Sequence, residues 1–169
     1  MRNTLVKVGL STAAAVLLMS SSAYAQPATA TASLNVTVNI AAKARLTLGA
    51  ASITFADQDP TAFPTLTAPT PLTVDVSART APAATVTLTV LASQDLTSGS
   101  NTIPVSTLAW TASGAGFAAG ASSTGTAQSV GSWAGSGLRS GTQTYSLPNS
   151  WTYAVGTYTT TLNYTLTAP

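Results

Sequence analysis

The dominant pattern in the sequence is an alternation of apolar and polar residues that begins at residue 34. Leu34, Val36, Val38 and Ile40 are apolar, and the residues between them are Asn or Thr. A period of two with many β-branched residues is typical of a strand with one buried face. The same pattern recurs at residues 46–48, 53–55, 72–76, 85–90, 103–105, 108–110, 145–147 and 158–166. Each of these segments is predicted to be a strand.

Turn-forming clusters separate the predicted strands. Asp57–Pro60, Pro64–Pro71, Ser98–Asn101 and Leu147–Ser150 are rich in residues that favour turns. The sequence shows no helical periodicity after its first 25 residues. About eight short strands in one domain predict an all-β fold, an antiparallel immunoglobulin-like β-sandwich over residues 34–169.

Two stretches depart from the alternation. Residues 26–33 are small and polar with one proline, and they are predicted to be a flexible lead-in. Residues 112–141 are rich in Gly, Ala and Ser, with few large apolar side chains. Sparse packing is expected there, so this stretch is predicted to form loops or weak edge strands.

The first 25 residues have the layout of a secretory signal peptide. Arg2 and Lys7 give a basic start, an apolar run follows over residues 8–19, and Ala23 and Ala25 provide the small residues of a cleavage site before Gln26. The apolar run is shorter than the roughly 20 residues of a membrane span, and no later segment qualifies. The sequence therefore predicts an exported protein, secreted or held at the cell surface or in the periplasm, whose mature chain begins at residue 26.

Charge and cysteine content narrow the classes of partner. Without residues 1–25 the chain has four basic residues and four aspartates, so the formal net charge of +2 falls to zero. A chain without a basic patch is not expected to bind nucleic acid. There is no cysteine, so an exported form must be stabilised by packing, hydrogen bonds or assembly. Low charge suits association with copies of itself or with a cell wall.

The inventory of reactive side chains argues against catalysis. The sequence contains no histidine and no glutamate, which removes the commonest general base and metal ligand. Serine and threonine hydroxyls are abundant, but a hydroxyl needs a neighbouring base to act as a nucleophile. The sequence therefore predicts a protein that is not an enzyme and uses no cofactor.

Two weaker candidate sites remain. Asp57 and Asp59, with Asp95 or backbone carbonyls, could bind calcium, although Asp-Pro sequences commonly begin turns. Trp133 and Trp151 follow short polar or glycine-containing stretches and could stack on sugar rings. The alternative for both tryptophans is a place in the core at one end of the sandwich.

The C-terminal segment, residues 156–169, resembles the closing strand of WxL-type surface domains. Those domains end in Tyr-x-x-x-Leu-x-Trp-x-Leu followed by proline, and here the matching residues are Tyr158, Leu162, Tyr164 and Leu166, with tyrosine at the tryptophan position. The signal and the last strand also resemble those of secreted spore-coat-U proteins and chaperone–usher pilin subunits. Those proteins usually carry a disulfide, whereas this chain has no cysteine.

Each resemblance implies a structural or binding role. The WxL resemblance implies a protein attached non-covalently to the cell wall, with wall polymer or other surface proteins as partners. The pilin resemblance implies self-association by strand exchange, in which residues 34–40 are the donated strand; the alternative is that this strand pairs within its own domain. The expected function is thus a structural or adhesive protein at the bacterial cell surface, and the alternative is a glycan-binding module.

Overall fold

The computed structural model describes residues 28–169 and falls into two units, residues 1–38 and residues 39–169. The predicted signal peptide, residues 1–25, lies outside the described residues. In the first unit, residues 28–38 contain no helix or strand, and their side chains are exposed.

The predicted strand at residues 34–40 does not form within the chain. Residues 28–42 have no secondary structure, and Leu34, Val36, Val38 and Ile40 are between 68% and 87% exposed. Alternation marks the faces of a strand, but a strand also needs a partner to bond its backbone. A hairpin with the first strand, which starts at Lys43, would need a two-residue turn made of Ala41 and Ala42. Such turns require positive φ angles, which alanine disfavours.

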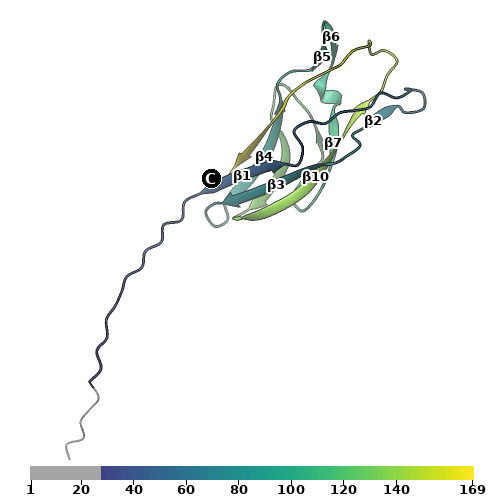
Figure 1. The fold of residues 1–169 in the computed structure, drawn as a ribbon. Coiled ribbons are helices and arrows are strands. Elements are labelled where there is room, and N and C mark those ends of the chain that lie inside the picture. The colour runs from purple at the N-terminus through teal and green to yellow at the C-terminus, as the bar shows by residue number, and fades with distance from the viewer. Residues whose placement is uncertain (1–27) are drawn as a thin grey trace, which may run out of the picture. The chain divides into compact units, whose positions relative to one another are not determined.

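The second unit is all-β, and its sheets are antiparallel (Figure 1). The larger sheet contains, in spatial order, β1 (Lys43–Leu48), β3 (Leu72–Arg79), β10 (Gly137–Pro148), β7 (Ala109–Ser113) and β8 (Gly120–Ala121), and β2 (Thr65–Thr67) also pairs with β10. The second sheet contains β11 (Leu162–Thr167), β4 (Thr85–Ala92) and β9 (Gln128–Ala134). A small hairpin of β5 (Leu96–Ser98) and β6 (Asn101–Ile103) precedes a single 3-10 turn, η1 (Val105–Thr107).

The core lies between the two sheets, as in a β-sandwich. In β3 and β4 the residues alternate between buried and more exposed, which confirms the strands expected at 72–76 and 85–90. Val74 and Leu88, one from each sheet, are fully buried in a single apolar cluster with Trp110 of β7 and Tyr145 of β10. The apolar faces predicted from the period of two therefore face each other.

The glycine-rich stretch is more ordered than predicted. Residues 112–141 contain β9 and the first part of β10, and β10 is central to the larger sheet. Packing is achieved by aromatic rings that sit on glycines: Phe117 covers Gly141, and Trp133 covers Gly116 and Gly131. Phe117 and Trp133 also meet edge to face, with ring centroids 4.9 Å apart. The expectation of loops and weak edge strands holds for residues 114–127, with the two-residue β8, and for β9, which is an edge strand. It fails for β10, and the aromatic packing was not foreseen, because absent side chains let rings approach the backbone closely.

Other predicted strands are shorter than their patterns. Residues 53–55 form no strand, although Ile53 and Phe55 are half-buried against the core. The strand predicted at 103–105 ends at Ile103, where Pro104 leads into η1, and the strand predicted over 158–166 begins only at Leu162. Among the described residues, no helix is long and apolar enough to cross a membrane.

β1 and β11 are edge strands of the two sheets and contact each other. β1 is followed by a segment without strand structure, residues 49–60, and β11 is preceded by another, residues 149–161, that has only isolated backbone bonds. The sandwich is therefore incompletely closed along this side.

Candidate functional site

A cleft of about 1090 Å³ lies along the incompletely closed side of residues 39–169. The segments that follow β1 and precede β11 form its two walls, and core side chains form its floor. Its apolar lining comprises Leu48, Ile53, Phe55, Leu66, Leu72, Leu96, Ile103, Leu108, Leu147, Tyr153 and Leu162, among others. Each of the two edge strands beside it has a neighbour on one side only among the described residues. We call this feature the edge cleft.

Two tyrosines at the floor of the edge cleft join the two sheets. Tyr164 of β11 donates its hydroxyl hydrogen to Gln143 Oε1 at 2.6 Å, and the hydroxyls of Tyr145 and Tyr164 are hydrogen-bonded to each other. Burial raises the pKa of Tyr164 to about 12, and burial, together with Tyr164, raises the pKa of Tyr145 well above its ordinary value. Neither phenol is thus a base at neutral pH. The fully buried Gln143 Nε2 has no hydrogen-bond partner among the described residues.

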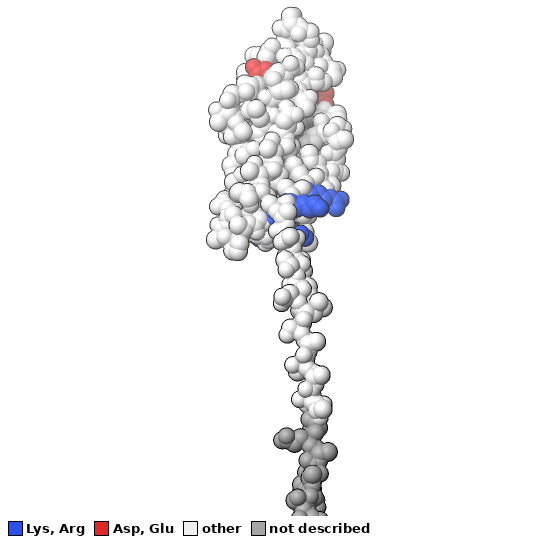
Figure 2. Space-filling view, turned by 90° about the vertical axis from the view of Figure 1, so that its left-hand side faces the viewer, with Lys and Arg blue, Asp and Glu red and all other residues white. Residues whose placement is uncertain are grey.

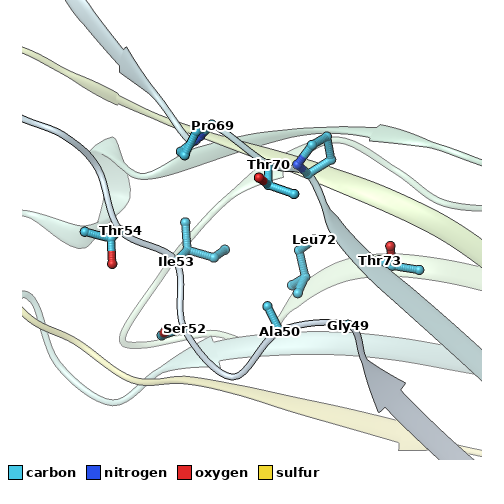
Figure 3. Close-up of a pocket in the computed structure, with 10 residues that line it drawn as sticks. Gly49, Ala50, Ser52, Ile53, Thr54, Pro69, Thr70, Leu72 and Thr73 are labelled. Atoms are coloured by element: carbon cyan, nitrogen blue, oxygen red, sulfur yellow. The ribbon is translucent and has the colours of Figure 1, made fainter.

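A second, smaller hollow of about 420 Å³ lies beside the first wall (Figure 3). It is formed by residues 49–54 and 69–73, and the side chains of Ile53 and Leu72 face it. Ile53 and Leu72 also line the edge cleft, so the segment that carries Ile53 has open space on both sides. The polar side chains that line the smaller hollow are threonine and serine hydroxyls, and none of the lining residues is charged. The hollow therefore offers no acid, base or metal ligand.

Two of the three aspartates considered for calcium accept backbone hydrogen bonds. Asp59 Oδ1 accepts a hydrogen bond from the Thr61 backbone N–H at 2.7 Å, as expected of a turn-forming aspartate. Asp95 Oδ1 accepts one from the Val105 N–H at 2.8 Å, at the start of η1. Asp57 lines the edge cleft with Asp59. Within residues 28–169, no three acidic, histidine or cysteine side chains are grouped closely enough to hold a metal ion.

Trp133 is not available as a sugar platform. It is only 8% exposed, and its indole N–H donates to the Ala115 carbonyl at 2.7 Å. The neighbouring glycines Gly116 and Gly131 have no side chains, so the Trp133 ring packs directly against the backbone and is buried. The sequence left two alternatives for Trp133, a glycan contact or a place in the core, and in the structure Trp133 belongs to the core.

Trp151 is 72% exposed and yet held in place. Its indole N–H donates to Thr61 Oγ1 at 3.1 Å. The neighbouring Asn149 fixes the same two loops to each other, because its Nδ2 donates to the carbonyls of Gln58 and Phe63 at 2.9 Å and 3.0 Å. Trp151 is therefore an exposed aromatic surface on an ordered loop.

The family-like residues of the C-terminal segment lie mostly on one face of β11. Leu162, Tyr164 and Leu166 are half-buried, and the residues between them are exposed, as the alternation predicts. Their burial is incomplete because β11 is an edge strand beside the edge cleft. Tyr158 precedes the strand, and its hydroxyl donates to the Ala154 carbonyl at 2.9 Å.

The edge cleft itself was not foreseen from the sequence. Its two walls are about 100 residues apart in the sequence, and a local sequence pattern does not predict that such distant segments lie side by side. The alternation at Ile53 and Phe55 predicted a strand there, and these residues instead belong to the first wall of the cleft.

No protein-family model matches this chain, and comparison with curated proteins and with solved structures gives no significant match.

Proposed function

We propose that this protein is an exported, non-catalytic structural subunit that assembles by strand donation. Residues 34–40 of one copy enter the edge cleft of the next copy and complete an immunoglobulin-like sandwich. The observation that carries the proposal is that one chain has two incomplete features: a strand-like segment with no partner strand among residues 28–169, and a sandwich with an open apolar side.

The chemistry of the two features is complementary. Leu34, Val36, Val38 and Ile40 point to one side of an extended segment because residues two apart share a face. Each gains about 1.5–3 kcal/mol when it moves from water into an apolar environment. The cleft supplies that environment, and its floor and walls are mainly aliphatic and aromatic.

The backbone of the segment also gains from insertion. β1 and β11 each have one edge with no neighbouring strand among residues 28–169. An exposed edge with an apolar face is a template for another strand. An inserted segment would bond its own N–H and C=O groups and cover an edge that otherwise invites unspecific aggregation.

Exchange between copies is favoured over closure within one chain. Only Ala41 and Ala42 separate the segment from β1, and two alanines do not form the tight turn that would fold it back beside β1. A second copy imposes no such turn. The resemblance to pilin and spore-coat-U subunits points to the same mode of assembly.

A pair of substitutions one residue apart tests the proposal. In the inserted segment Val36 would face the cleft, whereas Thr37 would face away from it. Val36→Asp places a charge in an apolar site and is expected to abolish assembly of the exported chain, because burying an unpaired carboxylate is costly. Thr37→Asp adds the same charge on the outer face and is expected to leave assembly intact. Sedimentation velocity and negative-stain electron microscopy measure both.

Two results would overturn the proposal. One is a wild-type chain that stays monomeric at high concentration. The other is that Val36→Asp and Thr37→Asp affect assembly equally, because the side of the segment that carries the charge would then make no difference.

A second candidate, glycan binding, is favoured by one observation, the ordered and exposed indole of Trp151. Aromatic faces of this kind suit stacking on apolar ring surfaces. If Trp151 is such a site, chitohexaose or cellohexaose binds the chain in calorimetric titration and Trp151→Ala weakens binding at least about tenfold. Leu138→Ala, at another exposed apolar residue, is the control. Absence of binding by the wild-type chain removes this candidate.

A further inference from the structure

The charged residues of the second unit are sorted toward opposite ends. All four basic residues lie at one end of the larger sheet: Lys43 is opposite Arg79 in the pairing of β1 with β3, Arg45 is opposite Ser77, and Arg139 is opposite Val76. We call this end the basic pole. Figure 2 shows the Lys and Arg side chains at the lower end of the domain and the visible acidic side chains toward its upper end.

Three of the four aspartates belong to the other end. Asp57 and Asp59 lie in a loop that is hydrogen-bonded to Asn149, the residue that follows the end of β10. Asp95 lies three residues after the end of β4. Asp57 and Asp59 are exposed, and both line the edge cleft. We call this end the acidic pole. The fourth aspartate, Asp75, lies nearer the basic pole, because it is opposite Thr47 and Ser140 and one residue from Val76, which is opposite Arg139.

We propose that the two poles meet in the assembly, so that the basic pole of one copy contacts the acidic pole of the next and fixes the direction of the inserted strand. The inference rests on the proposed strand donation. Ile40 is the last apolar residue of the donated segment, and Lys43 follows only three residues later. Wherever Ile40 leaves the cleft, the basic pole of the donor must therefore lie close by.

The charges distinguish the two ways of inserting the segment. If Ile40 leaves the cleft beside Asp57 and Asp59, opposite charges meet. If it leaves at the other end, beside β1 of the acceptor, the basic poles of two copies meet and repel each other. The first arrangement is the favourable one. It makes the donated segment antiparallel to β11 and parallel to β1, since those strands run in opposite directions relative to the poles.

The charges at the two poles mainly affect the rate and the direction of assembly. Pairs of exposed charges contribute little to the final stability of a contact, but complementary potentials accelerate encounter and suppress wrong orientations. The apolar segment supplies the stability, and the poles select which end of the cleft it enters. Trp151 shares the acidic pole, so its exposed indole would be covered except on the copy at the end of a chain.

Charge reversal in the full chain tests the inference. Asp59→Lys adds positive charge to the acidic pole, and Arg45→Glu adds negative charge to the basic pole. Each is expected to slow assembly about tenfold in 10 mM salt. In 1 M salt, where the screening length is about 3 Å, the effect should vanish. The double variant Asp59→Lys/Arg45→Glu restores opposite charges and should regain most of the rate. Asp75→Lys changes the net charge as Asp59→Lys does, but away from the acidic pole and without reversing the charge of either pole, and it serves as the matched control. Light scattering gives the rates.

Lys43 permits a direct test of the contact, since it is the one lysine among residues 28–169. A carbodiimide that joins an amine to a carboxylate in contact should link Lys43 of one copy to Asp57 or Asp59 of the next, as peptide mass spectrometry would show. If the wild-type chain assembles but all variants assemble at the same rate, or if Lys43 links to no aspartate of that loop, the inference is wrong. If the wild-type chain does not assemble at all, the proposed strand donation fails with it.

Discussion

At the scale of single residues, the hydroxyl of Tyr164 bridges the sheets through Gln143 and Tyr145. Tyr164→Phe keeps the ring and removes that hydroxyl, so Gln143 Oε1 loses the hydrogen bond that Tyr164 donates. Leaving a buried polar group without its partner costs about 1–3 kcal/mol. We expect the free energy of unfolding to fall by about that amount in chemical denaturation. Tyr158→Phe, which removes a hydroxyl from the loop before β11, is the control and should have a much smaller effect.

The same tyrosines predict a loss of stability in alkali. In the unfolded chain both phenols have an ordinary pKa of 10.0, whereas in the fold both pKa values are raised, that of Tyr164 to about 12. Their contribution is therefore fully present below pH 10 and is lost as the pH rises above 10, since the unfolded chain releases its protons first. Between pH 10 and pH 12 the free energy of unfolding should fall by up to about 1.4 kcal/mol per pH unit for each tyrosine. Denaturation series at several pH values measure the slope, and a flat profile would contradict the prediction.

Glycines that carry aromatic rings give a second test at this scale. A Cβ at Gly141 would meet the Phe117 ring and lie 2.6 Å from the Ser113 carbonyl oxygen, whereas a Cβ at Gly125 would meet nothing within 4 Å. Gly141→Ala should lower the free energy of unfolding by about 1–3 kcal/mol, the usual effect of overpacking. Gly125→Ala should change it by less than about 0.5 kcal/mol. Equal effects in urea denaturation would mean that the ring does not rest on Gly141.

At the scale of strands, β4 and β11 differ in how well they are covered. Leu88 of β4 is fully buried, and Leu162 of β11 is half-buried beside the edge cleft. Leu88→Ala should cost about 2–5 kcal/mol of unfolding free energy in the monomer, and Leu162→Ala clearly less. In the assembled form the inserted segment would cover Leu162, so Leu162→Ala should also weaken assembly. If Leu162→Ala leaves assembly unchanged while it lowers monomer stability, this stretch of the cleft receives no strand.

Strands with a regular alternation and a partner nearby in the fold were predictable from sequence. β3 and β4 follow their patterns because both faces of the pattern are used, one toward the core and one toward water. In the glycine-rich stretch only loops and weak edge strands were predicted, and the central position of β10 was missed, since a glycine gives no periodic signal even where Phe117 or Trp133 rests on it. Residues 34–40 show the opposite case: the pattern is strong, but residues 28–169 contain no strand that pairs with them.

At the scale of the molecule, the proposed strand donation would make residues 34–40 a ligand of the remaining fold. In the Val36→Asp chain the edge cleft should stay intact, while the segment proposed to fill it in a neighbour would be defective. A peptide with the wild-type sequence of residues 28–42 should therefore bind that variant and raise its melting temperature further as the peptide concentration increases. A peptide with the same composition in scrambled order should not. Scanning calorimetry over a range of peptide concentrations measures the shift, and its absence would show that the cleft does not accept this segment.

The brevity of the link between Ile40 and Lys43 has a mechanical consequence. Ile40 and Lys43 can be at most about 11 Å apart along an extended chain, so a copy whose segment lies in its neighbour's cleft would be held close against that neighbour. A chain of such copies would resemble a stiff rod more than beads on a string, with a repeat fixed by the length of one domain. Tension along the rod would fall on the inserted strand lengthwise, so its backbone hydrogen bonds would have to shear together before any joint could open.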